Sequence, residues 1–206
     1  IGYGKTYYQK AVNWMYQTVP QPMLNNKESY WPRGKVWGGS SSINAMVYIR
    51  GNQKDYDDWA ALGNKGWSYA ELLPYFKRSE TAQKGDTQYR GNSGPLYVSD
   101  VSKDMHPLVN TWVKAGVELG FDYNSDFNGA SQDGVGLYQQ NTKNGWRVSA
   151  AKAYLHPARK RNNVTISSHS QVSRILFEGK RAVGVEYRKG GKLIRVYANK
   201  EVICSA

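Results

Sequence analysis

The sequence predicts an α/β protein, which for these 206 residues means an α+β arrangement with helices first and an antiparallel β-meander last. Residues 55–62 and 107–119 place apolar side chains at helical spacing. After residue 163 the pattern changes to short runs rich in Val, Ile, Tyr and Phe, separated by Gly-Lys and Gly-Gly turns. These observations indicate hairpin-connected strands that follow a helical region.

The first half of the chain is predicted to contain loops and short helices. The N-terminal 32 residues are aromatic and rich in loops, with a short extended run at residues 12–16. A capping box at Ser68 and Glu71 predicts a helix over residues 71–75, which Pro74 must end or kink.

The second half is predicted to contain one alanine-rich helix over residues 150–160 and then strands. Gly179-Lys180 and Gly190-Gly191 supply two hairpin turns between them. The predicted strands are residues 164–167, 171–178, 182–189, 192–198 and 201–205.

The segment with the most chemical information is residues 33–44, which read RGKVWGGSSSIN. The adjacent glycines Gly38 and Gly39 permit backbone conformations that other residues avoid, and they let a ligand approach the main chain closely. Three serine hydroxyls and successive N–H groups follow, a combination that suits phosphate or the polar edge of a ring. The alternative is a Gly/Ser loop that only turns the chain.

The longer segment that starts at Gly34, GKVWGGSSSINAMVYIRGNQKDYDDW, resembles the signature of the glucose-methanol-choline (GMC) flavoprotein oxidoreductases. The resemblance covers essentially the whole chain and is strongest for the bacterial choline or alcohol dehydrogenase branch. It implies part of an FAD-binding fold, with part of a substrate domain, from an enzyme that oxidises a primary alcohol to an aldehyde by hydride transfer to the flavin. The other similar segments are residues 66–80, 89–99, 126–139, 144–155 and 172–187.

The resemblance implies FAD contacts along the Gly/Ser loop and just after it. Asn44 would bond the polar edge of the flavin, or would instead close its own loop as an Asx turn. Arg33 and Lys35 would face the pyrophosphate, or would be solvated loop charges. The expected cofactor contacts are Arg33, Lys35, Gly38, Gly39, Ser40, Ser42, Asn44, Ala45, Met46, Val47 and Val172.

Two further positions carry implications from the resemblance. Ile43 stands where some family members attach FAD covalently through a histidine, so FAD is expected to be held non-covalently here. Arg147 lies where the substrate domain meets the flavin in the family, as do Tyr138, Gln139 and Asn141. We expect Arg147 to tie segments together rather than to contact substrate.

The resemblance also implies how the chain is divided. Residues 1–65 would form the FAD lid and the flavin-contacting loop, residues 66–145 a region partly of the substrate domain, and residues 146–206 a return to the FAD-binding domain. No G-x-G-x-x-G dinucleotide motif occurs. We therefore expect an internal fragment that is inactive alone, whose partners are an alcohol substrate and the missing N- and C-terminal parts of the same enzyme.

No catalytic or metal-binding residue is expected within the chain. His106 and His156 each precede a proline and His169 stands among serines, and none matches the context of the family's catalytic histidine. The absence of G-x-S-x-G argues against a serine hydrolase, and three scattered histidines with the single Cys204 lack metal-ligand spacing.

The charge supports a rival interpretation. A formal net charge of +12 would suit a binding module for nucleic acid or another anionic surface. The basic residues, however, fall at predicted helix ends and turns rather than in a stripe, which argues against nucleic acid. A non-catalytic truncated or split GMC product is the other alternative.

The lone cysteine and the lack of a long apolar run predict a cytoplasmic location without a transmembrane segment, with membrane association as an alternative.

Overall fold

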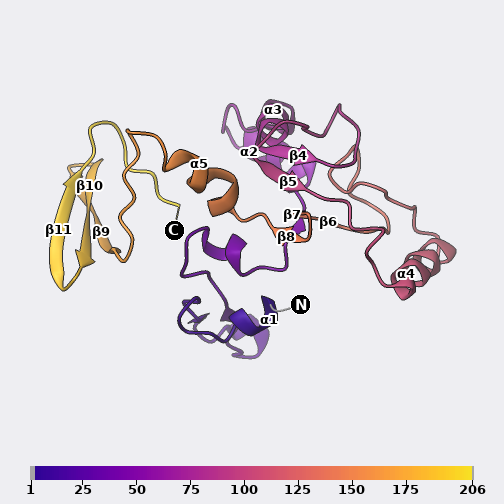
Figure 1. Cartoon of the computed structure of the whole chain (residues 1–206), viewed down its shortest axis with the longest axis horizontal. Helices are drawn as coiled ribbons and strands as arrows, with labels where there is room; N and C mark the ends of the chain where they lie inside the picture. The colour runs from indigo at the N-terminus through magenta and orange to yellow at the C-terminus, as the bar shows by residue number, and fades with distance from the viewer. Residues whose placement is uncertain (1–2, 206) are drawn as a thin grey trace. The chain divides into compact units, whose positions relative to one another are not determined.

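The computed structural model describes residues 3–205, and the chain divides into two compact units, unit 1 (Ile1–Ala158) and unit 2 (Arg159–Ala206). Figure 1 labels helices and strands along the chain. Each unit is considered by itself. Helices and small sheets are mixed along the chain, which confirms the predicted α+β class.

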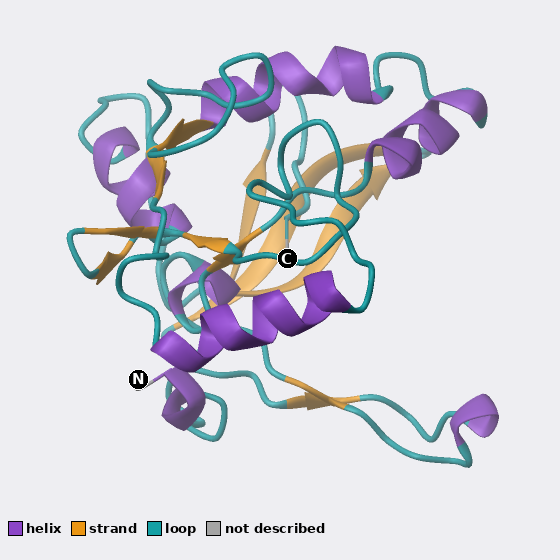
Figure 2. Ribbon diagram, turned by 90° about the vertical axis from the view of Figure 1, so that its right-hand side faces the viewer, coloured by secondary structure: helices purple, strands orange, loops and turns teal. Residues whose placement is uncertain are grey.

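Unit 1 begins with an aromatic hairpin whose tip is a short 3₁₀ turn (Figure 2). Asn13 is almost fully buried and ties the base of the hairpin, because its side-chain oxygen accepts hydrogen bonds from the N–H groups of Met15 and Arg33 at 3.0 and 2.9 Å. The elements are α1 (Tyr3–Thr6), β1 (Tyr16–Gln17), the turn η1 (Pro22–Leu24) and β2 (Tyr30–Trp31).

The centre of unit 1 combines helices with a parallel strand pair. The helices predicted at residues 55–62 and 107–119 are confirmed, and both capping-box bonds predicted at Ser68 are present. The strand after α3 pairs in parallel with a strand that starts at Leu96. The elements are α2 (Gln53–Ala61), α3 (Tyr69–Ser79), β4 (Glu80–Ala82), β5 (Leu96–Val98) and α4 (Pro107–Glu118).

Pro74 does not end its helix, so the expectation of a helix confined to residues 71–75 is wrong. The helix α3 continues to Ser79. Proline removes one N–H bond from the helix, but packing at both ends compensates for that loss. Tyr56 of α2 packs against Tyr69 and Phe76 at ring-centroid distances of 6.3 and 5.4 Å, so α3 is held on both sides of the proline.

The remaining elements of unit 1 surround the Gly/Ser loop. The helix predicted at residues 150–160 is present as a π-helical turn that continues into a short α-helix. These elements are η2 (Gly39–Ser42), β3 (Val47–Tyr48), β6 (Gln139–Gln140), β7 (Thr142–Lys143), β8 (Trp146–Arg147), η3 (Ala151–Leu155) and α5 (His156–Ala158).

A buried ionic cluster lies at the centre of unit 1. The Glu80 carboxylate is fully buried and accepts hydrogen bonds from Arg50 Nη2 at 2.7 Å and from Arg90 Nε at 2.8 Å. The N–H of Gly91 adds a third bond at 2.9 Å. Arg90 also pairs with Asp126 at 2.7 Å. Because a buried carboxylate is costly without partners, these segments must come together for unit 1 to fold.

The cluster changes the acidity of its members. Burial by itself would raise the pKa of Glu80, but hydrogen bonds from Arg90 and Gly91 and the nearby guanidinium charges hold it below its ordinary value. Burial and the Glu80 charge raise the pKa of Tyr48 to about 12. Glu80 is therefore the ionised acceptor of the cluster at neutral pH.

Replacement of Glu80 tests the cluster directly. Glu80→Gln leaves the buried guanidinium of Arg50 without a counter-ion and leaves Arg90 with Asp126 alone, and it is expected to lower the free energy of unfolding by about 3–5 kcal/mol. Chemical denaturation measures the effect. The matched control is Asp58→Asn, which breaks an exposed pair with Lys54 and is expected to leave stability unchanged. Equal effects of the two changes would contradict the role given to Glu80.

The same residue predicts a pH dependence. Since the folded pKa of Glu80 lies below its ordinary value of 4.5, the unfolded chain binds this proton more readily. The stability that Glu80 contributes is fully present above pH 4.5 and is lost as the pH falls through the folded pKa. Thermal unfolding in acid is expected to show a steeper loss for the wild type than for Glu80→Gln. Parallel curves would refute this.

Unit 2 is a three-stranded antiparallel meander in the order β11-β10-β9. The predicted hairpin turns are confirmed, and Gly190 and Gly191 both have positive φ, as a two-residue hairpin turn requires. The strands are β9 (Gln171–Glu178), β10 (Arg181–Lys189) and β11 (Lys192–Tyr197).

Two predicted strands of unit 2 are absent. Residues 164–167 and 201–205 have strand-like composition but adopt no strand structure. Neither segment is joined to a neighbour by a tight turn, so no local hairpin supplies a partner for its backbone groups. Of the five predicted strands, those that form are the three joined to one another by hairpin turns.

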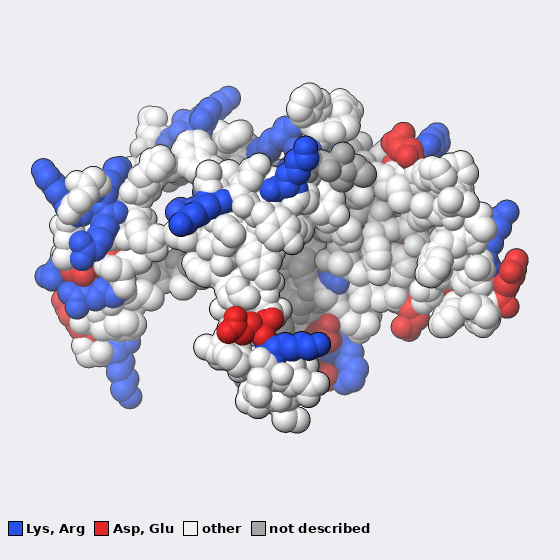
Figure 3. Space-filling model, turned by 90° about the horizontal axis from the view of Figure 1, so that it is seen from below, with Lys and Arg blue, Asp and Glu red and all other residues white. Residues whose placement is uncertain are grey.

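Unit 2 also carries much of the positive charge. Eleven of the 28 Lys and Arg residues and only three of the 16 Asp and Glu residues belong to it. Figure 3 shows these basic side chains gathered at the left of the view. The buried Glu186 pairs with Arg174 and Arg195, whose hydrogen bonds lower the pKa of Glu186 to about 2.

Candidate functional site

The Gly/Ser loop turns sharply and requires its glycines. Gly38 and Gly39 have φ values of +88° and +54°, in the left-handed region that favours glycine. A Cβ at Gly38 would lie 2.5 Å from Ser42 Oγ and 3.1 Å from the backbone nitrogen of Ala151. A Cβ at Gly39 would meet no heavy atom within 4 Å. Gly38 thus faces a packed neighbour, whereas Gly39 faces open space.

The loop is held by residues more than 100 positions away in the sequence. Arg147 Nη1 donates to the carbonyl oxygen of Ser41 at 3.0 Å and to Asn44 Oδ1 at 2.8 Å. Ser41 Oγ accepts a hydrogen bond from the N–H of Ala150 at 2.8 Å. Arg147 therefore ties two segments together, as expected. Ser41 was not among the expected site residues, because its partner cannot be recognised from local sequence.

The backbone after the loop is unusual. Asn44 Oδ1 accepts from the N–H of Met46 at 3.1 Å, which is the Asx turn considered as an alternative for Asn44. Met46 has a φ of +66°, which is rare for a side chain of its size and is a feature of functional sites. The carbonyl oxygen of Met46 accepts from the N–H of Asn141 at 2.8 Å, and Val47 pairs with Gln140 across β3 and β6.

Asn141 adds an unsatisfied polar group beside this backbone. Its side-chain Nδ2 is buried and has no hydrogen-bond partner among residues 3–205. An amide left in this state destabilises the fold unless a further acceptor is supplied. Asn141 is thus a polar group of this region with unused donor capacity.

The two predicted cationic contacts lie at the base of the hairpin. The Arg33 guanidinium stands 4.9 Å from the centre of the Trp31 ring, and Lys35 Nζ stands 4.6 Å from the centre of the Trp14 ring.

Ten of the eleven predicted cofactor contacts lie in unit 1, between residues 33 and 47. Val172 belongs to β9 of unit 2, where it is half exposed.

The three histidines lie in different parts of the chain. His106 caps α4, since its Nδ1 accepts from the N–H of Leu108 at 3.2 Å. His156 meets the ring of Trp37 edge-on, and His169 lies in unit 2 with a φ of +51°.

Ile43, where some family members would carry a histidine, is buried, with 4% of its surface exposed. Within residues 3–205 no group of three or more His, Cys, Asp or Glu side chains is placed to hold a metal ion.

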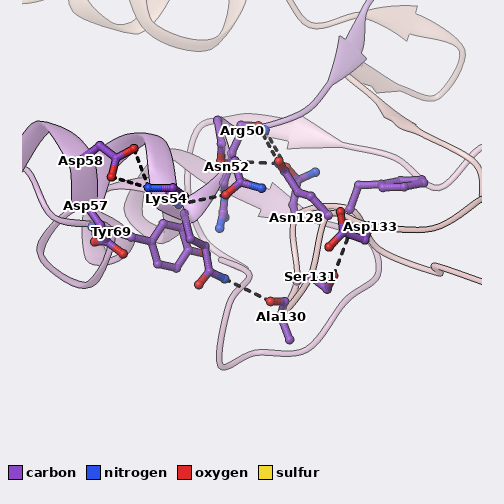
Figure 4. Close-up of a pocket in the computed structure, with 15 residues that line it drawn as sticks. Arg50, Asn52, Lys54, Asp57, Asp58, Tyr69, Asn128, Ala130, Ser131 and Asp133 are labelled. Atoms are coloured by element: carbon purple, nitrogen blue, oxygen red, sulfur yellow. Dashed lines mark hydrogen bonds and ion pairs between the residues drawn. The ribbon is translucent and has the colours of Figure 1, made fainter. Parts of the chain in front are cut away.

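A polar cleft of about 430 Å³ lies elsewhere in unit 1, between the start of α2 and residues 127–133 (Figure 4). Asn128 Oδ1 accepts from the N–H of Arg50 at 2.7 Å, and Gln132 Nε2 donates to the Arg50 carbonyl at 2.8 Å. These bonds hold residues 127–133 against Arg50. Because Arg50 also bonds to Glu80, the cleft borders the buried ionic cluster. None of its lining residues belongs to the Gly/Ser loop.

Comparison with known sequences identifies the family. The GMC oxidoreductase family model matches residues 8–206, so the chain belongs to the GMC oxidoreductase family. Mouse mitochondrial choline dehydrogenase is 48% identical over 94% of the chain, and the oxygen-dependent choline dehydrogenase of Sinorhizobium fredii is 50% identical over 94%. The matches cover 32% and 35% of those proteins, so the chain spans about a third of their length.

Solved structures show the same fold. Pyridoxine 4-oxidase from Mesorbium loti superposes with a TM-score of 0.92 at 30% identity, covering 99% of this chain and 40% of that one. An FAD-dependent oxidoreductase from Chaetomium thermophilum gives 0.83 at 35% identity, covering 92% and 35%. Among residues 3–205 no helix is long and apolar enough to span a membrane.

The two loop glycines are expected to respond differently to substitution. Gly38→Ala combines a left-handed backbone with a clash against Ser42 and Ala151, and is expected to cost about 2–4 kcal/mol of stability. Gly39→Ala meets open space and is expected to cost only the backbone term, about 1 kcal/mol. Chemical denaturation of both variants checks the difference. A greater loss for Gly39→Ala would show that the packing around Gly38 is misplaced.

Proposed function

We propose that this chain is the flavin-contacting part of an FAD-dependent oxidoreductase that oxidises a primary alcohol, choline or a similar one, to an aldehyde. The observation that carries the proposal is the identity of 48–50% to choline dehydrogenases over 94% of the chain. Choline carries a primary hydroxyl group. Loss of a hydride from its carbinol carbon and of a proton from its oxygen yields the aldehyde.

The residues of the Gly/Ser loop fit a flavin. The space in front of Gly39 lets a planar ring approach the main chain, and Asn44 retains free amide hydrogens on the same segment. The left-handed Met46 holds the following backbone in a fixed, otherwise unfavourable conformation. When bound, FAD would supply the hydride acceptor. The loop residues, with Asn44, Ala45, Met46 and Val47, would orient the ring and exclude water from it.

The chain alone is proposed to be inactive. None of its three histidines lies on the loop segment, and His106 is already used as a helix cap. It lacks a G-x-G-x-x-G turn to hold the pyrophosphate. We propose that residues 1–65 and 146–206 belong to the FAD-binding domain and residues 66–145 partly to the substrate domain, and that the rest of the same enzyme supplies the base.

The proposal predicts flavin that is bound but releasable. Protein made from the complete gene is expected to purify yellow, and acid denaturation is expected to release all FAD, because the buried hydrocarbon of Ile43 cannot form a bond to it. Absorbance of the supernatant and the intact mass of the protein give the measurement. Choline-dependent reduction of the bound flavin tests the activity.

Three results would contradict different parts of the proposal, namely the cofactor, its non-covalent attachment and the substrate. Protein without flavin would remove the cofactor assignment. A mass increased by that of FAD after denaturation would remove the non-covalent attachment. Flavin that is reduced by other primary alcohols but not by choline would retain the reaction and exclude the substrate.

A second candidate, a basic binding module, is favoured by one observation. Unit 2 holds eleven basic and three acidic residues. If such a surface binds a polyanion, the affinity must fall steeply with salt, because counterions are released on binding. Heparin or duplex DNA binding that does not change between low and high salt would dismiss this candidate.

A further inference from the structure

The amide of Asn44 is oriented by two donors. Its Oδ1 accepts from the N–H of Met46 at 3.1 Å and from Arg147 Nη1 at 2.8 Å. Neither a backbone N–H nor a guanidinium can accept a hydrogen bond, so the oxygen must face both groups. The Nδ2 then occupies the opposite edge of the amide, and the hydrogen bonds of the Asn44 side chain with residues 3–205 all go to its Oδ1.

We propose that Arg147 is a positioning residue for the cofactor. It fixes the Asn44 amide so that the Nδ2 hydrogens face an acceptor atom, a carbonyl oxygen or a ring nitrogen, on the edge of the flavin ring. This inference rests on the proposed function, because it takes the ligand of the loop to be FAD. Arg147 itself need not contact the cofactor.

The geometry favours Arg147 over the Asx turn as the group that decides the orientation. A charge-assisted hydrogen bond is roughly twice as strong as a neutral one. A flipped amide would turn its NH₂ group toward the guanidinium, which offers only donors. Burial lowers the pKa of Arg147, yet a guanidinium stays protonated at neutral pH, so the bond persists.

Arg147 is itself held in place. The antiparallel pair β7–β8 places Thr142 opposite Arg147, and the same Nη1 that reaches Asn44 also donates to the carbonyl oxygen of Ser41 at 3.0 Å. The neighbouring bond from the N–H of Ala150 to Ser41 Oγ holds the two segments at this separation. The guanidinium therefore has a fixed position from which to orient the amide.

A double-mutant cycle tests the inference. Four forms of the flavoprotein made from the complete gene are stripped of FAD and titrated with it: wild type, Asn44→Ala, Arg147→Met and the double variant. Each single change is expected to raise the Kd for FAD about five- to tenfold, the loss of one hydrogen bond. The double variant is expected to stay within about twofold of Asn44→Ala, because Arg147 acts through Asn44.

The redox potential gives a second readout that loop stability alone would not move. Loss of a donor to the flavin edge destabilises its electron-rich reduced form, so the midpoint potential is expected to fall in both single variants and by no further step in the double variant. Arg147→Lys keeps one cationic nitrogen that can serve both acceptors, and is expected to retain part of the affinity. Arg159→Met, a change of an exposed arginine outside the loop, is the matched control and is expected to alter neither quantity.

The outcomes separate this inference from the proposed function. Equal weakening by Arg147→Met with and without Asn44, or no weakening at all, overturns the positioning role while FAD binding by the wild type stands. Wild-type protein that binds no FAD overturns the proposed function and this inference with it. If Arg147→Met fails to fold by circular dichroism, the cycle is run with Arg147→Lys. Its smaller rise in Kd is expected to disappear in the Asn44→Ala background, and a rise that persists there overturns the positioning role.

Discussion

The buried carboxylate of Glu80 is the constraint on which unit 1 depends. It joins Arg50, which follows β3, to Arg90, and Arg90 in turn donates to Gln139 Oε1 of β6 at 2.6 Å. Because β3 and β6 pair with each other, the cluster fixes the frame beside which the Gly/Ser loop stands. A charge removed from water in this way tolerates few alternative arrangements of its partners.

Much of the fold follows from local signals in the sequence. The capping box at Ser68, the apolar spacing of α4 and the glycine turns of the meander each involve neighbours in the chain, and each was predicted. The errors arose where distant packing decided the outcome. Aromatic contacts with α2 carry α3 past Pro74, and residues 164–167 and 201–205 lack a neighbouring strand. Glu80 carries no mark in the sequence that distinguishes it from a surface carboxylate.

The residues of the candidate site also fall into those that the sequence could identify and those that it could not. Gly38, Gly39 and Asn44 could be selected from their chemistry and from the family resemblance, and the link through Arg147 was expected. Ser41 could not be selected from the sequence, because nothing in the sequence distinguishes a serine whose hydroxyl accepts from the N–H of Ala150 from any other serine. The unpartnered side-chain amide of Asn141 and the left-handed backbone of Met46 are likewise properties of the folded structure. Their residue types do not reveal them.

The long-range bonds of the loop set an order of folding. The contacts of Ser41 with Arg147 and Ala150 span 106 and 109 residues, so the loop cannot take its final shape until the chain between them has been made and folded. The helices of unit 1 need no such delay, because their contacts are local. We therefore expect the surface that we propose for the cofactor to be among the last parts of unit 1 to form. A nascent chain that stops before residue 147 would carry the whole Gly/Ser sequence without the contacts of Ser41 that hold the loop.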